Sequence, residues 1–241
     1  MCIELKNNAV MEHSINYAFK HQVIVDSVNN VIGTEVLIDF QRTDYDLDIV
    51  ERFLFSHSAS ACIDTIGQCL SFFPKYVFMN IERDVLCNKS VIEKICNLSA
   101  LIFEQGKNLV VEVTERNACG NCTKNQTGLQ LLQENNVLIA ADDYDYLNGD
   151  FREQELCSSL YQFVKVEAPL DLYELAKLNL FAKDNVVRNL SLIIERVPTM
   201  DFFHWIKRSV KEVGIDVFGF QGFAFCRGQA IDLDLAIGER I

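Results

Sequence analysis

The sequence is poor in the residues that interrupt regular structure: it has 3 prolines and 11 glycines among 241 residues. No Pro- or Gly-rich stretch reads as a linker, so we expect a single domain over residues 1–241. No apolar run reaches the roughly 18 residues that a membrane span needs. The first residues, MCIELKNNAVMEHS, lack the basic-then-apolar pattern of a secretory signal. These absences predict a cytoplasmic protein without a membrane partner.

Positive charge is also scarce: the sequence has 22 Lys and Arg against 34 Asp and Glu, which gives a formal net charge of −12. We therefore expect neither DNA nor RNA polymers as partners, because a polyanion is not attracted without a basic patch. The nine cysteines are an odd number scattered through apolar segments, which argues against a disulfide framework. An anionic substrate remains compatible with this charge if metal ions lie between substrate and protein.

Strand-like and helix-like segments alternate along the chain, which predicts parallel strands joined by crossover helices. Eight strands over about 250 residues are typical of a (β/α)₈ barrel. An open doubly wound sheet is the alternative, but neither GxGxxG nor GxxxxGK[ST] is present. The expected strands are 22–26, 31–38, 76–81, 108–113, 137–142, 163–166, 190–195 and 216–221. The expected helices are 47–55, 58–70, 89–104, 126–135, 170–182 and 199–213.

Nearly every expected strand delivers a polar side chain at or near its C-terminal end. In a barrel, that end carries the active site, which is assembled from several strands. Lys165 lies inside an apolar strand, where an ammonium group needs a carboxylate partner to stay charged. The full set is Glu35, Asn80, Glu112, Glu115, Asp142, Asp143, Lys165, Glu195 and Gln221.

Carboxylates dominate this set, and like charges in a confined site raise one another's pKa. Divalent cations relieve that repulsion, and carboxylate and amide oxygens are hard ligands that suit Mg²⁺, Mn²⁺ or Ca²⁺ rather than Zn²⁺. The adjacent carboxylates of Asp142 and Asp143 are placed to reach two metals. Two metals about 3.5–4 Å apart form a clamp for phosphodiester hydrolysis.

Several short segments follow one another in a fixed order: Glu35-Val36-Leu37, then MNIERDVL, VEVTER, ADDYDYLNG, VKVE, IIERVPT and FQGFAFCRG. Over about residues 17–228 the series resembles the EAL-domain family, the bacterial phosphodiesterases of cyclic di-GMP. The family's segments are Glu-Ala-Leu, Asn-Leu-Ser, Glu-Leu-Thr-Glu, Asp-Asp-Phe-Gly-Thr-Gly, Lys-Ile-Asp, Ala-Glu-Gly-Val-Glu-Thr and Gln-Gly-Tyr. The order and spacing of the matches carry the resemblance.

The resemblance implies a TIM-like (β/α)₈ barrel of the EAL type with one reversed strand. It implies hydrolysis of cyclic di-GMP to linear pGpG with two Mg²⁺ or Mn²⁺ ions, which would lower the second messenger and affect motility, biofilm or fimbriae. Glu35, Lys165 and Gln221 would be catalytic, Glu115 would anchor a loop, and Gln22 would contact the substrate. Arg196, which departs from the family pattern, is our own candidate to replace the phosphate-binding arginine that is lost at Asp39. A homodimer is a further expectation. The metal ligands would be Glu35, Asn80, Glu112, Asp142, Asp143 and Glu195.

Departures from the family pattern leave other functions open. Asp39 reverses the charge of an arginine that contacts a substrate phosphate, and Tyr144–Leu147 replaces a glycine-containing loop. Arg196-Val197-Pro198 replaces Gly-Val-Glu. An inactive EAL-like protein that regulates a transcription or motility factor by binding it is one alternative. A receptor that binds cyclic di-GMP without cleaving it is another, and an unrelated barrel such as a glycosidase, using Glu112 and Glu195 as its acid and base pair, is a third.

Overall fold

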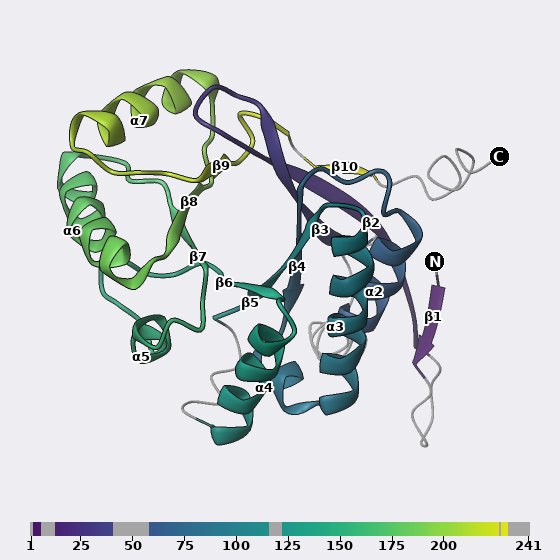
Figure 1. The fold of residues 1–241 in the computed structure, drawn as a ribbon. Helices are drawn as coiled ribbons and strands as arrows, with labels where there is room; N and C mark the ends of the chain where they lie inside the picture. Colours follow the sequence, from purple (N-terminus) through teal and green to yellow (C-terminus); the bar gives the residue numbers. More distant parts are fainter. Residues whose placement is uncertain (1, 6–12, 41–57, 116–121, 227, 231–241) are drawn as a thin grey trace.

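The computed structural model describes residues 2–5, 13–40, 58–115, 122–226 and 228–230. Its centre is a closed barrel of eight strands, β2 to β9, in sequence order (Figure 1). The strands are β1 Cys2–Leu5, β2 His13–Val25, β3 Val31–Phe40, β4 Tyr76–Ile81, β5 Asn108–Val113, β6 Leu138–Ala141, β7 Phe163–Glu167, β8 Ser191–Glu195, β9 Gly219–Gln221 and β10 Gln229–Ala230. The helices are α2 Ser58–Gln68, α3 Lys89–Glu104, α4 Thr123–Glu134, α5 Glu153–Cys157, α6 Leu172–Arg188, α7 Met200–Glu212 and the short 3₁₀ helix η1 Arg83–Cys87.

The reversed strand is β2. It pairs antiparallel with β3 on one side and with β9 on the other, and this second pairing closes the barrel. The remaining neighbours, from β3 through β9, pair in parallel. The prediction of a TIM-like barrel with one reversed strand is thus confirmed.

The eight expected strands correspond to β2–β9, with β2 longer and β9 shorter than expected. Two more strands, β1 and β10, were not expected, and both pair antiparallel with β2. The short elements η1 and α5 were also not expected, because five residues are too few to show a helical period. The expected helix 47–55 lies outside the described residues.

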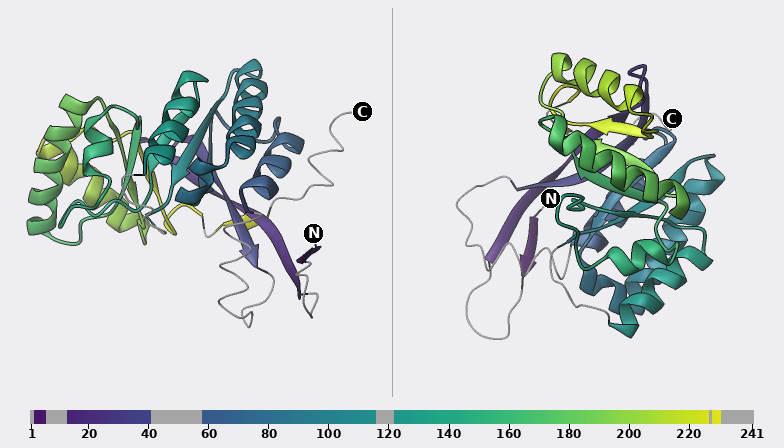
Figure 2. Two further views of the ribbon diagram at one scale, coloured as in Figure 1. Left: turned by 90° about the horizontal axis from the view of Figure 1, so that it is seen from below. Right: turned by 90° about the vertical axis from the view of Figure 1, so that its left-hand side faces the viewer.

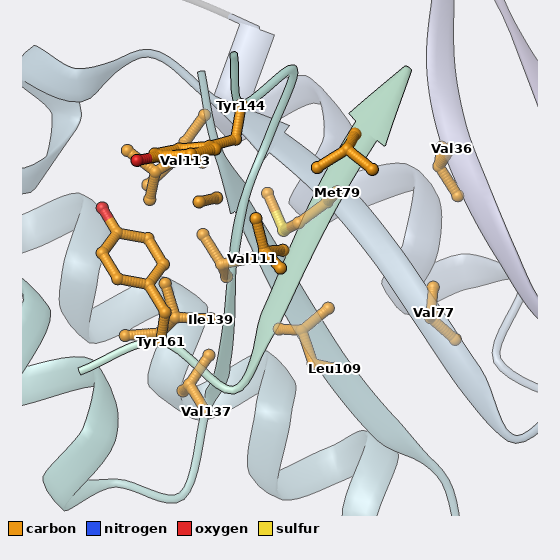
Figure 3. Close-up of a cluster of buried hydrophobic side chains, with 14 of the residues drawn as sticks. Val36, Val77, Met79, Leu109, Val111, Val113, Val137, Ile139, Tyr144 and Tyr161 are labelled. Atoms are coloured by element: carbon orange, nitrogen blue, oxygen red, sulfur yellow. The ribbon is translucent and has the colours of Figure 1, made fainter. Parts of the chain in front are cut away.

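Helices cover the outside of the barrel. Figure 1 shows α2, α3 and α4 together on one side, with α6 and α7 on the opposite side. Alternate side chains along each strand face these helices, because successive strand residues point to opposite faces. Val77 and Met79 of β4, Leu109 and Val111 of β5, and Ile139 of β6 are fully buried in this outer layer (Figure 3). Removing them from water is the main stabilising contribution to this layer.

The other face of the strands fills the barrel interior. One layer of this interior is apolar and made of Ile24, Phe78, Val110, Ala140, Phe163 and Ile193. Because the side-chain period of a strand is 2, the next inward-facing residue lies two positions along. From Phe78 that residue is Asn80, from Val110 it is Glu112, and from Ile193 it is Glu195. A polar layer therefore rests directly on an apolar floor.

The long hairpin of β2 and β3 extends past this polar layer. Both views of Figure 2 show the two strands continuing beyond the barrel side by side, and their register runs out to Tyr17 opposite Phe40.

Within the described residues, no helix is long and apolar enough to cross a lipid bilayer. Seven cysteines among the described residues are free thiols.

Candidate functional site

The ammonium group of Lys165 lies at the centre of the polar layer. Its Nζ is 2.8 Å from Glu112 Oε1 and 2.8 Å from Glu195 Oε1. It is also 3.2 Å from Glu35 Oε2 and 3.2 Å from Asp142 Oδ1. Lys165 is only 1% exposed, so its charge depends on these partners. Carboxylates from the middle of β3, from the C-terminal ends of β5 and β8 and from the residue after β6 thus converge on one cation.

Glu35 is held by amide groups as well as by Lys165. The Asn80 Nδ2 group donates a hydrogen bond to Glu35 Oε1, and the Gln221 Nε2 group donates to Glu35 Oε2. Gln221 also donates to Gln22 Oε1 at 3.1 Å, while Gln22 Nε2 donates to the backbone carbonyl of Cys226 at 3.2 Å. Gln22 and Glu35 are cross-strand partners in the β2–β3 register. The amide groups therefore fix which way the Glu35 carboxylate faces.

Excess negative charge is the main electrostatic property of this site. Burial, together with the neighbouring Glu35, raises the pKa of Glu112 well above its usual range. Burial also raises the pKa of Asp142, and it raises that of Glu195 to about 8. Burial alone would raise the pKa of Glu35, but the Lys165 ammonium and the hydrogen bonds from Gln221 and Asn80 hold this pKa below its usual value. One lysine does not neutralise the cluster, so protons or further cations are needed.

Two buried oxygens fit a metal ion. Asn80 Oδ1 and Glu112 Oε2 have negligible exposure and accept no hydrogen bond from the described residues. An orphaned buried acceptor is costly unless a donor or a cation satisfies it. Carboxylate and amide oxygens are the donors that Mg²⁺ and Mn²⁺ prefer. The residues at the mouth of the barrel therefore fit a divalent cation.

Asp142 and Asp143 lie where the β6 strand ends. Ligand oxygens of Glu115, Asp142 and Asp143 all lie within 4.8 Å of one another, close enough to share a metal ion. Asp143 adopts a positive φ of 43°, a conformation that Asp tolerates better than most residues. The backbone thus turns sharply at this point, and the two side chains meet different partners.

Arg196 is the partner of Asp143. Its Nη2 lies 3.1 Å from Asp143 Oδ1 and 3.2 Å from Asp143 Oδ2, and its Nη1 lies 3.3 Å from Glu167 Oε2. Arg196 has a φ of 56°, in the left-handed region that favours glycine. The guanidinium bridges two carboxylates at the rim of the barrel.

An open cavity of about 460 Å³ leads down to the cluster. Both polar and apolar side chains line it, as in binding sites for small ligands. Gln22 and Arg196, the two predicted substrate contacts, both line this cavity, as does the exposed Phe223. Except for Asn80, Glu112 and Glu115, the predicted site residues border it: Gln22, Glu35, Asp142, Asp143, Lys165, Glu195, Arg196 and Gln221.

Solved structures share this architecture. Klebsiella pneumoniae BlrP1, in a complex with calcium and cyclic di-GMP, matches with a TM-score of 0.67 and 20% identity over 89% of this chain and 56% of that chain. An EAL-domain protein of Listeria monocytogenes EGD-e matches with a TM-score of 0.66 and 19% identity over 93% of this chain and 92% of that chain. PaMucR phosphodiesterase, in a cyclic di-GMP complex, matches with a TM-score of 0.70 and 17% identity over 89% of this chain and 97% of that chain. The chain has the fold of an EAL domain.

At these identities the likeness establishes the fold and not the activity. No family model matches the sequence, and no curated protein matches it. The chain spans about half the length of BlrP1, 56%, but nearly all of the Listeria protein, 92%. The EAL fold explains why polar residues scattered over the sequence converge, because the strands bring all of them to the same end of the barrel.

The loop that departs from the EAL pattern is well packed. The Tyr144 hydroxyl donates to Glu153, and its ring stacks on Phe181 with centroids 5.1 Å apart and planes at 15°. The Asp145 carboxylate accepts from the backbone N–H groups of Leu147 and Asn148, each at 3.0 Å. These short-range hydrogen bonds hold the loop in its conformation without the glycines that the EAL pattern has at these positions.

Sequence reasoning missed two buried arginines that support this loop. Arg152 donates to the backbone carbonyl of Val113 at 3.0 Å and pairs with Asp150 at 2.6 Å. Arg83 of η1 pairs with Glu155 of α5 and packs over the Phe151 ring at 5.0 Å. Both arginines have no exposed surface. Charged residues within a polar stretch are normally predicted to face solvent. Nothing in the sequence therefore indicated that these two arginines are buried.

Asp39 lies on the hairpin beyond the barrel mouth. Its carboxylate is 2.9 Å from the ammonium of Lys20 on the neighbouring strand β2. Both side chains are partly exposed, and the pair is locally neutral. The position at which the EAL family pattern has arginine therefore carries no net positive charge here.

Proposed function

We propose that this chain is a divergent member of the EAL family that hydrolyses cyclic di-GMP to linear pGpG with Mg²⁺ or Mn²⁺. The observation that carries the proposal is the convergence of three buried carboxylates and the partly buried Asp142 on Lys165, beside the orphaned oxygens of Asn80 and Glu112. Such an assembly holds cations, and it opens into a cavity large enough for a small ligand. The fold shared with a phosphodiesterase supports the same activity.

Each site residue has a role in this proposal. Bound cations would activate water and stabilise the leaving oxygen. Lys165 Nζ would donate a hydrogen bond that orients the attacking water, since it is fixed between carboxylates of opposite strands. Gln221 would keep the Glu35 carboxylate turned toward the cation, and Glu115 would hold the loop that follows Asp143. The residues that would hold cations are Glu35, Asn80, Glu112, Asp142, Asp143 and Glu195.

Substrate contacts come from the cavity rim. The side chain of Arg196 is 58% exposed, so its guanidinium is accessible to a phosphate oxygen. Gln22 lines the same cavity and supplies an amide for a polar contact. Phe223 is 68% exposed and offers an aromatic face on which a guanine base would stack. We therefore assign the phosphate to the Arg196 side and a base to the Phe223 side.

The direct test is incubation of the purified protein with cyclic di-GMP and Mg²⁺ or Mn²⁺, with products separated by chromatography. The control is Glu35→Gln, which keeps the side-chain volume but removes one ligand charge. We expect pGpG with the unchanged protein and a loss of at least 100-fold in rate for the control. Equal product with both proteins would reveal a contaminating enzyme. Binding of cyclic di-GMP without any product would identify a receptor instead.

A second candidate is regulation by protein binding, for instance of a transcription or motility factor. Leu170, Leu172 and Tyr173 are 69%, 75% and 67% exposed beside the barrel mouth. Large exposed apolar side chains that lie together mark interaction surfaces. A pull-down that captures the same protein with Glu35→Gln and loses it with Leu172→Asp would support this candidate. A homodimer would be recognised by analytical ultracentrifugation with the same pair of variants.

The remaining expectations follow from this proposal. The cytoplasm is the proposed location, because the free thiols of the described residues suit a reducing compartment. Hydrolysis there would lower the second messenger and so affect motility, biofilm or fimbriae. A glycosidase is not proposed, because Glu112 is 0% exposed and so is not accessible as an acid or base to a sugar.

A further inference from the structure

The two adjacent carboxylates of Asp142 and Asp143 are bound by two different cationic side chains. Asp142 Oδ1 lies 3.2 Å from the buried ammonium of Lys165. Asp143 turns the other way, and both of its oxygens contact Arg196 Nη2 at 3.1 and 3.2 Å. The Asp pair therefore faces one position inside the barrel and one at the rim. Only the outer position is filled by a permanently charged guanidinium.

Arg196 bridges carboxylates in the manner of a metal ion. Its two terminal nitrogens contact Asp143 of the β6–α5 loop and Glu167 at the end of β7. Asp143 is itself within metal-sharing distance of Glu115 and Asp142. Because a guanidinium is not deprotonated in proteins, it does not vacate this position with pH. A second divalent cation at Asp143 would either displace the Arg196 guanidinium or be repelled by its positive charge.

The backbone directs Arg196 into this position. The residue after it, Val197, exchanges backbone hydrogen bonds with the β9 end: its N–H donates to Gln221 O and its carbonyl accepts from Ala224 N–H, both at 3.0 Å. Arg196 itself has a φ of 56°. A non-glycine residue persists in this region only when its surroundings over-determine it. The backbone from which its side chain reaches Asp143 is thus held in place by the β8–α7 connection.

We propose that the guanidinium of Arg196 takes the place of a second metal ion, so that this site binds one divalent cation. This inference rests on the proposed cation-dependent function and narrows it, because Asp143 then binds Arg196 instead of a cation. The inner cation is the one that Glu35, Asn80, Glu112, Asp142 and Glu195 hold. At the rim, Arg196 supplies the positive charge that a phosphate oxygen meets, and it supplies it permanently.

The test is the number of Mn²⁺ ions bound per chain, measured by equilibrium dialysis and by the loss of the free-ion paramagnetic resonance signal. Four proteins are compared: the unchanged protein, Arg196→Gly, Arg196→Ala and Arg208→Ala. Arg208 is an exposed residue of α7 that lines a different cavity, so its removal changes the net charge equally without touching Asp143. Circular dichroism confirms that each variant folds.

We expect one Mn²⁺ for the unchanged protein and for Arg208→Ala, and two for both Arg196 variants. Two ions in the unchanged protein, or one ion in both Arg196 variants, would overturn the inference and leave cation-dependent hydrolysis intact. Two ions in Arg208→Ala would also overturn it, because the net charge of the protein would then determine the number of bound Mn²⁺ ions. Failure of all four proteins to bind Mn²⁺ would overturn the proposed function itself and this inference with it.

Discussion

Lys165 and Glu112 form an ion pair of 2.8 Å in which neither side chain is more than 1% exposed. The two residues lie on β7 and β5, with β6 between them, and both point inward above the apolar layer of the barrel. Lys165 is also the shared partner of three more carboxylates. It therefore acts as the internal counter-ion of the site when no metal is bound.

Replacing this counter-ion should make folding depend on added metal. Lys165→Met keeps the length of the side chain but leaves the carboxylates uncompensated, which should lower the free energy of unfolding by about 3–5 kcal/mol at neutral pH. Saturating Mn²⁺ should restore a large part of that loss. Urea denaturation with and without Mn²⁺ measures both effects. Lys183→Ala, an exposed lysine of α6, is the matched control and should change little.

Stability without metal should fall as the pH rises. The folded-state pKa of Glu195 is about 8 against an ordinary value of 4.5, so between these values the folded state binds a proton that the unfolded state has lost. The free energy of unfolding should therefore decrease from pH 5 to pH 8 in a chelating buffer. Mn²⁺ should flatten this slope, because it binds the deprotonated ligands. A slope that is equal in both buffers would contradict the proposed ligand role.

Gly222 should be intolerant of any side chain. A Cβ atom there would come within 2.3 Å of the backbone N and O of Val197, and its φ is 150°. Gly222→Ala should destabilise the fold by about 1–3 kcal/mol and displace the adjacent Gln221 from Glu35. Gly214→Ala is the control, since Gly214 has a φ of 77° but nothing within 4 Å of its Cβ position. Thermal unfolding and hydrolysis rates should separate the two variants.

The charge at Asp39 should tune ligand affinity. Asp39→Asn removes a negative charge near the mouth and frees the Lys20 ammonium, so cyclic di-GMP should bind a few-fold more tightly. Lys20→Ala should have the opposite effect, because it removes a positive charge beside Asp39. Calorimetry at low and high salt checks the cause, since screening should shrink both differences. Equal affinity of the unchanged protein, Asp39→Asn and Lys20→Ala would mean that the phosphates of bound cyclic di-GMP lie far from this hairpin.

Much of the fold was predictable because its signals are local. Apolar runs such as 108–113 mark buried parallel strands, and the amphipathic helices between them show the helical period. The polar residue near the end of such a run, Glu112 for example, was recognisable by its place in the strand. That placement is enough to bring the ligands together once the barrel closes.

The rest depended on backbone geometry that residue types do not encode. Arg196 contacts Asp143 from a backbone with positive φ, and no composition rule gives that sign for an arginine. The reversal of β2 followed from the family resemblance rather than from its apolar pattern, since an antiparallel strand has the same side-chain period as a parallel one. The buried Arg83 was missed because its partner, Glu155, lies 72 positions away.

Closure of the barrel has a consequence for synthesis of the chain on the ribosome. Gln221 Nε2 bonds Gln22, 199 positions earlier, and Glu35, 186 positions earlier, and β9 is the strand that joins β2. Until β9 and β10 emerge, residues 20–25 of β2 keep an open edge with unpaired backbone groups, which is a template for pairing with other chains. A nascent chain that stalls before Gln221 therefore has neither a finished site nor a protected edge. We expect such truncated products to depend on chaperones, whereas the complete chain does not.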